Sequence, residues 1–84
     1  MSIEHLQQMA NDIGHFFAIE PHEVAVAGIA NHIQRFWDPR MRRQILAHLQ
    51  AGGQGLEPLV REALGRVTVP PSAQAVGNTL IRKA

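Results

Sequence analysis

Apolar residues recur in this chain at intervals of three and four positions, which is the period of an α-helix and not of a β-strand. The first apolar stripe consists of Ile3, Leu6, Met9, Ala10, Ile13, Phe16 and Phe17. Ser2 precedes this stripe and is a favourable N-cap, and Glu4 lies in the first turn, where the helix macrodipole stabilises an acid. The pattern predicts a helix from Ser2 to about Phe17. Gly14 inside that helix costs about 1 kcal/mol relative to alanine, so we expect a close helix crossing there.

Proline and glycine divide the following sequence into three further helical segments. The expected helices are Pro21 to about Phe36, Pro39 to about Gln50, and about Glu57 to Arg66. Proline fits the first position of a helix because it lacks an N–H group that would have no partner there. Glycine fits the position after the last turn because it adopts the left-handed conformation easily. Ala51-Gly52-Gly53 is therefore expected to end the third helix.

The dipeptide Asp38-Pro39 is the sharpest boundary in the sequence. A proline pushes the residue before it out of the α region, and aspartate is also a favourable N-cap. The helix that ends near Phe36 and the helix that begins at Pro39 must therefore meet within one or two residues. We predict a rigid corner at this point.

The predicted fold class is all-α, a small bundle of about four short helices. A chain of 84 residues has room for one hydrophobic core, which we place in a helical domain at residues 1–67. Residues 68–84 begin with a segment that contains two consecutive prolines and continue with small and polar residues that show no periodicity. This part of the chain is predicted to be a flexible C-terminal tail.

Composition restricts the compartment and the class of partner. The chain contains no cysteine, which excludes disulfides, thiolate metal sites and cysteine nucleophiles and fits a reducing cytoplasm. The N-terminus lacks the pattern of a signal peptide, and no run of apolar residues is long enough to span a membrane. A net charge of +1 predicts no strong attraction to nucleic acid. The corner is also too short for the turn of a helix-turn-helix motif.

The sequence offers no catalytic residues and no metal site. None of the five histidines stands three or four positions from another, so no helix carries a metal-binding pair. Serine and threonine lie near the ends of the chain, and tyrosine is absent. The segment Gly52-Gly53-Gln54-Gly55 lacks the preceding strand and the following Gly-Lys-Ser/Thr of a phosphate-binding loop. We interpret it as a helix cap followed by a tight turn.

The segment from Arg35 to Arg43 carries the functional signal. It places four arginines and two aromatic residues around the corner, and with one aspartate the local charge is near +3. Arginine and tryptophan are enriched at binding hot spots, and arginine forms bidentate pairs with carboxylate or phosphate. We expect Phe36 to lie in the core. The predicted partner-binding residues are Arg35, Trp37, Asp38, Pro39, Arg40, Arg42 and Arg43.

Several motifs together resemble one protein family. They are Met9-Ala10-Asn11, Ile13-Gly14, Phe16-Phe17, Ile29-Ala30-Asn31-His32, the run from Arg35 to Arg42, Ala51-Gly52-Gly53, Gly55-Leu56 and the run from Pro58 to Leu64. In this order and spacing they resemble the delta subunit of soluble NAD-dependent formate dehydrogenase over about residues 5–66. The most specific stretch is the arginine-rich run with the Ala-Gly-Gly that follows it.

The resemblance implies a noncatalytic role in a cytoplasmic enzyme complex. In that family the catalytic alpha subunit carries bis-molybdopterin guanine dinucleotide with molybdenum or tungsten, and the complex also holds iron–sulfur clusters, FMN and NAD. The delta subunit has no redox centre and supports assembly, cofactor insertion or stability of the alpha subunit. We therefore expect this chain to bind the alpha subunit and no cofactor permanently. The alternative is chaperone-like binding of an anionic nucleotide or pterin cofactor through the arginines. The sequence leaves self-association open.

Overall fold

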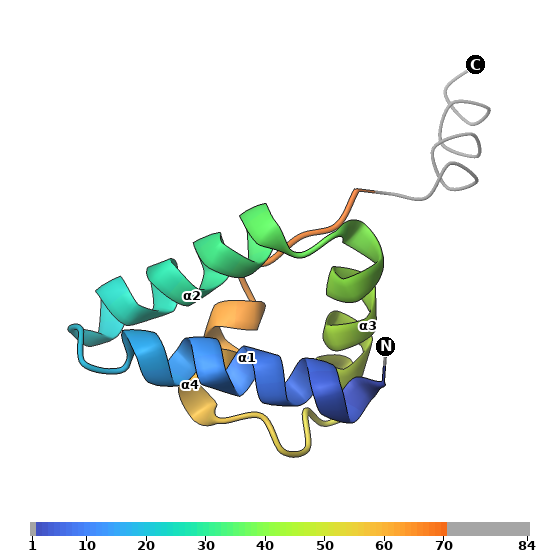
Figure 1. The fold of residues 1–84 in the computed structure, drawn as a ribbon, viewed down its shortest axis with the longest axis horizontal. Coiled ribbons are helices and arrows are strands. Elements are labelled where there is room, and N and C mark those ends of the chain that lie inside the picture. Colours follow the sequence, from blue (N-terminus) through green and yellow to red (C-terminus); the bar gives the residue numbers. More distant parts are fainter. Residues whose placement is uncertain (1, 71–84) are drawn as a thin grey trace.

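The structure is a computed structural model that describes residues 2–70, and within this range it contains four α-helices and no β-strand. The helices are α1 (Ile3–Phe17), α2 (His22–Phe36), α3 (Pro39–Gln50) and α4 (Pro58–Leu64). Helices α1, α2 and α3 follow three sides of a triangle, and the short helix α4 packs against all three of them (Figure 1). The all-α class predicted from the sequence is confirmed.

Side-chain caps set the predicted starts of two helices. Ser2 Oγ accepts a hydrogen bond from the backbone N–H of His5 at 3.1 Å, and Asp38 Oδ1 accepts one from Met41 N–H at 2.9 Å. The expected ends of α1 and α3 are confirmed.

The other two helices are shorter than predicted at their ends. Helix α2 begins one residue later than predicted because Pro21 adopts an extended conformation and forms its N-cap. Helix α4 lies between Glu57 as N-cap and Gly65 as C-cap. The residues after Gly65 continue in tight turns, where the N–H of Arg66 bonds to Ala63 O and that of Val67 to Leu64 O.

The core is formed by apolar side chains from all four helices and the segments after α2, α3 and α4. Its buried members are Leu6, Ala10, Val26, Ile29, Ala30, Ile33, Trp37, Ile45, Leu56, Val60, Ala63, Leu64 and Val67. Burial of each of the larger ones contributes about 1.5–3 kcal/mol. The predicted close crossing at Gly14 is present, because a Cβ atom there would lie 2.6 Å from Val60 Cγ2 of α4.

The prediction that Phe36 belongs to the core is wrong. Phe36 is 69% exposed, whereas the adjacent Trp37 is 4% exposed and packs in the core. The difference arises where α2 ends. Phe36 is the last helical residue, whereas Trp37 is the C-cap and has an extended backbone, with φ −87° and ψ 135°. The helical period therefore cannot be used to place the Trp37 side chain. Phe16 likewise belongs to the predicted stripe of α1 and is 75% exposed.

The segment between α3 and α4 is a capped helix end followed by a turn, as predicted. Gly53 has a positive φ of 63°, and its N–H bonds to His48 O at 2.9 Å. Arg61 of α4 donates to Gly53 O at 2.9 Å and to Leu56 O at 3.1 Å. These carbonyls therefore face a cation of the protein itself. Helix α3, and not a β-strand, precedes the segment, so it lacks the setting of a phosphate-binding loop.

The predicted tail at residues 68–84 lies mostly outside the described residues. At its start, Thr68 N–H donates to Gln34 Oε1 at 2.8 Å, and Gln34 Nε2 donates to Thr68 O at 3.2 Å. Residues 71–84 are not described, so the prediction of a flexible tail stays a prediction. Within residues 2–70, none of the helices combines the length and apolar character needed to cross a membrane.

Candidate functional site

The arginine corner, residues 35–43, is the place where α2 ends and α3 begins. The structure divides the seven residues that the sequence singled out into two groups. The exposed group consists of Arg35, Asp38, Pro39, Arg40 and Arg43. The buried group consists of Trp37 and Arg42. Only the exposed group is available to a partner on the surface of this chain.

Arg42 stabilises the corner from inside. Its side chain is almost fully buried, and Nη1 donates to Gln34 O at 2.9 Å and to Trp37 O at 2.7 Å. These carbonyls lie at the C-terminal end of α2, where helix geometry leaves oxygens without partners and the macrodipole favours a cation. The buried Nε atom has no hydrogen-bond partner within the described part of the chain. Arg42 therefore links the start of α3 to the end of α2.

Asp38 and Pro39 fix the direction of the chain between the two helices. Asp38 is the N-cap of α3, Pro39 occupies the first helical position, and Trp37 packs into the core beside them. The ring of Pro39 restricts its own φ, and the capping bond holds the Asp38 side chain. The corner is therefore held in one geometry by local bonds and by burial.

The outer face of the corner carries three cations. Arg40 and Arg43 are three positions apart on an exposed side of α3, and Arg35 lies near the end of α2. None of their three side chains forms a hydrogen bond or an ion pair among the described residues, and the guanidinium of Arg35 lies 5.8 Å from the ring centroid of Phe36. Guanidinium groups that pair with no carboxylate of their own chain's described residues are suited to carboxylates or phosphates of a partner.

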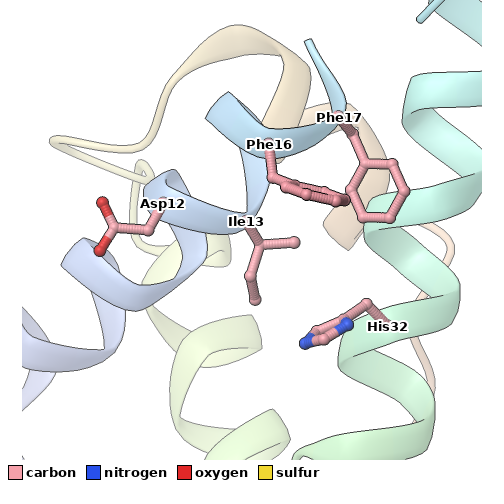
Figure 2. A pocket seen from close by; sticks show the side chains of 5 residues that line it. All are labelled: Asp12, Ile13, Phe16, Phe17 and His32. Atoms are coloured by element: carbon pink, nitrogen blue, oxygen red, sulfur yellow. The ribbon is translucent and has the colours of Figure 1, made fainter. Parts of the chain in front are cut away.

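A second surface feature, which sequence reasoning missed, adjoins the corner. We call it the aromatic groove, and it consists of Ile13, Phe16 and Phe17 of α1 with His32 of α2. These side chains surround an open hollow of about 330 Å³, while the carboxylate of Asp12 points away from it (Figure 2). His32 and Phe36 have ring centroids 4.8 Å apart, so we count Phe36 as the end of the groove, where the guanidinium of Arg35 lies over its ring. The sequence signal was the pair Phe16-Phe17, since neighbouring residues of a helix cannot both face the core.

Two histidine–glutamate pairs lie on the surface of residues 2–70, and this part of the chain shows no metal site. His15 Nε2 lies 2.7 Å from Glu57 Oε2, and His22 Nε2 lies 2.8 Å from Glu62 Oε1, and both pairs are open to solvent. Across the described residues, no three His, Asp or Glu side chains converge on a metal position. An iron–sulfur cluster needs cysteine thiolates, and the chain has no cysteine. The residues present therefore do not fit such a cluster.

Comparison with known proteins gives a family match. The family model for the NADH-dependent formate dehydrogenase delta subunit FdsD matches residues 5–64. The match covers both the arginine corner and the aromatic groove. Neither the curated proteins nor the solved structures gave a match.

Proposed function

Because the chain belongs to the delta-subunit family of NADH-dependent formate dehydrogenase, we propose that it is a noncatalytic subunit that docks on the catalytic alpha subunit of that enzyme. In this proposal it supports assembly, cofactor insertion or stability of the alpha subunit in the cytoplasm. The molybdenum or tungsten cofactor, the iron–sulfur clusters, FMN and NAD are held by other subunits.

The observation that carries the proposal is the set of exposed arginines on a fixed corner. Arg35, Arg40 and Arg43 have no acidic partner among the described residues, while Arg42 and Trp37 hold the corner from inside. Because the backbone of the corner is already fixed, binding does not have to order the backbone that carries these arginines. The corner is therefore suited to acidic side chains on a larger protein.

The test is the affinity of the purified catalytic subunit for the full chain and for a variant with Arg35, Arg40 and Arg43 changed to alanine. We expect the variant to bind at least 10-fold more weakly, and its affinity to depend less on salt, because charge-assisted contacts are lost. Arg42 is left unchanged because its removal would disturb the fold. Equal affinity of the variant and the wild type would contradict the site.

Arg66→Ala is the matched control. It also removes an exposed arginine, but one that pairs with Glu23 at the opposite end of α2. That position is about 20 Å from the corner along the helix axis. We expect Arg66→Ala to bind the catalytic subunit with wild-type affinity.

A second candidate function is transient binding of an anionic nucleotide or of the pterin cofactor before it is inserted. It is favoured by Arg40 and Arg43, which share an exposed side of α3 and could both reach one phosphate group. Calorimetric titration with a guanine nucleotide and with the pterin cofactor tests it. Heat of binding that disappears in the Arg40→Ala/Arg43→Ala variant supports this function, and no heat over a wide concentration range contradicts it.

A further inference from the structure

In the described part of the chain, four large apolar side chains are mostly exposed, and two of them, Phe16 and Phe36, are rings at the aromatic groove. Phe16 is 75% exposed and Phe36 is 69% exposed. Contact of such rings with water is unfavourable by about 25 cal/mol per Å² of apolar surface. Apolar surface that is contiguous and bordered by polar groups is typical of a binding site.

The rings of the groove pack against one another and against α2 before any partner binds. Phe17 packs against Gly28 of α2 so closely that a Cβ atom there would lie 2.5 Å from the ring. Phe16 meets Phe17 edge to face, with centroids 5.1 Å apart and an interplanar angle of 88°. On the other side, His32 lies against Phe36. The groove is therefore a formed surface and needs little rearrangement to bind.

The lining of the groove selects against two kinds of occupant. Its walls are side chains of two complete helices, which offer no free backbone edge to an added β-strand. It also lacks the convergent polar groups that orient a small molecule, because Asp12 points away and His32 is the remaining polar side chain (Figure 2). An apolar side chain from another protein fits this lining better than either.

The positive charge at one end of the groove indicates which side of the occupant is acidic. Arg35 lies beside Phe36 at the end of α2 and has no acidic partner among residues 2–70. Beyond it the corner adds Arg40 and Arg43, which are cations as well. An occupant that carries carboxylates on the side facing Arg35 would neutralise this end of the surface.

We propose that the aromatic groove receives an amphipathic helix of the catalytic subunit. Its apolar side chains, spaced three and four residues apart, enter between Phe16 and His32, and an acidic side chain next to them pairs with Arg35. This inference rests on the proposed function and adds the binding element and its chemistry. It also explains why Phe16 and Phe36 are exposed in the separate chain.

The first test measures the affinity of the catalytic subunit for Phe16→Gln, Phe36→Gln and Arg35→Glu. Each is expected to bind at least 10-fold more weakly than the wild type. Ile19→Gln is the matched control because Ile19 is 89% exposed in the α1–α2 turn and does not line the groove. We expect it to change the affinity less than twofold. Circular dichroism should show the same thermal midpoint for all four variants and the wild type.

The outcomes separate this inference from the proposed function. Failure of the wild-type chain to bind the catalytic subunit contradicts the proposed function itself. Wild-type binding that Phe16→Gln and Phe36→Gln both retain contradicts only the groove. Dimerisation of the wild type in sedimentation experiments that Phe16→Gln abolishes, with binding of the catalytic subunit unchanged, would assign the groove to a second copy and overturn the inference.

A photo-crosslinking amino acid at position 16 identifies the occupant in the assembled complex. Mass spectrometry of the crosslinked peptide is expected to give a segment of the catalytic subunit with apolar residues at helical spacing and an adjacent aspartate or glutamate. A crosslink to a segment without helical periodicity, or to a second copy of this chain, contradicts the inference.

Discussion

The two faces of the arginine corner contain the same residue types and have different roles. On the inner face, Trp37 packs in the core and Arg42 bonds to the last carbonyls of α2. On the outer face, Phe36 is 69% exposed and Arg43 has no partner among the described residues. Trp37 and Arg42 thus stabilise the fold, whereas the side chains of Phe36 and Arg43 stay on the surface, where a partner can contact them. Residue type alone therefore does not assign a role in this segment.

The neighbouring rings provide the largest contrast. Trp37→Ala removes a buried indole and is expected to lower the free energy of unfolding by about 3–5 kcal/mol. Phe36→Ala removes a ring that mostly contacts water, so this variant should lower the free energy of unfolding by less than about 1 kcal/mol. Urea denaturation followed by circular dichroism gives both values. Equal destabilisation by the two variants would contradict the assignment of inside and outside.

The neighbouring arginines provide the next contrast. Arg42→Ala leaves the carbonyls of Gln34 and Trp37 without their donor in a buried place, and it should cost about 2–3 kcal/mol. Arg43→Ala should stay within about 0.5 kcal/mol of the wild type, because it removes no contact. Unfolding can be followed by the fluorescence of Trp37, the single tryptophan of the chain. The inner role of Arg42 is wrong if both variants unfold at the wild-type urea concentration.

Two glycines extend the comparison from the corner to the groove. At Gly14 a Cβ atom would meet the buried Val60, so Gly14→Ala should destabilise by about 1 kcal/mol after its gain in helix propensity is subtracted. At Gly28 a Cβ atom would meet the ring of Phe17, which is only half-buried and can rotate toward the groove. Gly28→Ala should keep its stability and weaken binding of the catalytic subunit. Denaturation and affinity measurements on both variants test this difference, and a Gly28→Ala variant that loses stability but keeps its affinity contradicts it.

The smallest effect is expected at the end of α2 opposite the corner. The hydrogen bond from Arg66 lowers the pKa of the Glu23 carboxyl below its usual value. Because the pKa of Glu23 is lower in the folded chain, the pair stabilises the fold fully at pH values above the pKa that Glu23 has in the unfolded chain. The contribution is lost as the pH falls through the lower pKa of the folded state. Because the pair is exposed, its contribution to stability should be small.

Arg66→Ala should return the pKa of Glu23 toward its usual value, as NMR titration of its carboxyl carbon would show. The same variant should leave the chemical shifts of the arginine corner unchanged, which makes it a control for the larger effects. A pKa of Glu23 that does not move in Arg66→Ala contradicts the pairing.

Local signals in the sequence determine most of the fold. The caps Ser2 and Asp38 and the glycines after α3 act within a few residues, so they could be identified without the structure. The crossing at Gly14 could also be predicted, because glycine destabilises a helix interior and is expected there only where two helices pack closely. These features depend on spacing along the chain and not on how the helices are placed relative to one another.

The division of the candidate site could not be predicted in the same way. Trp37 turns inward because the backbone becomes extended there, after the last residue to which the helical period applies. Arg42 is buried because the start of α3 passes close to the carbonyls of α2, which depends on the angle of the corner. The aromatic groove is formed by side chains of α1 and α2 that meet only in the folded chain. Each of these features depends on tertiary geometry.

Hydrogen–deuterium exchange of the chain, alone and bound to the catalytic subunit, tests the central claim most directly. The claim is that the outer face of the corner and the aromatic groove form the docking surface. We predict slower exchange on binding in residues 12–17 and 32–43, and unchanged exchange in residues 57–66 of α4 and its flanks. Protection confined to residues 57–66, with none at the corner or the groove, would contradict the claim.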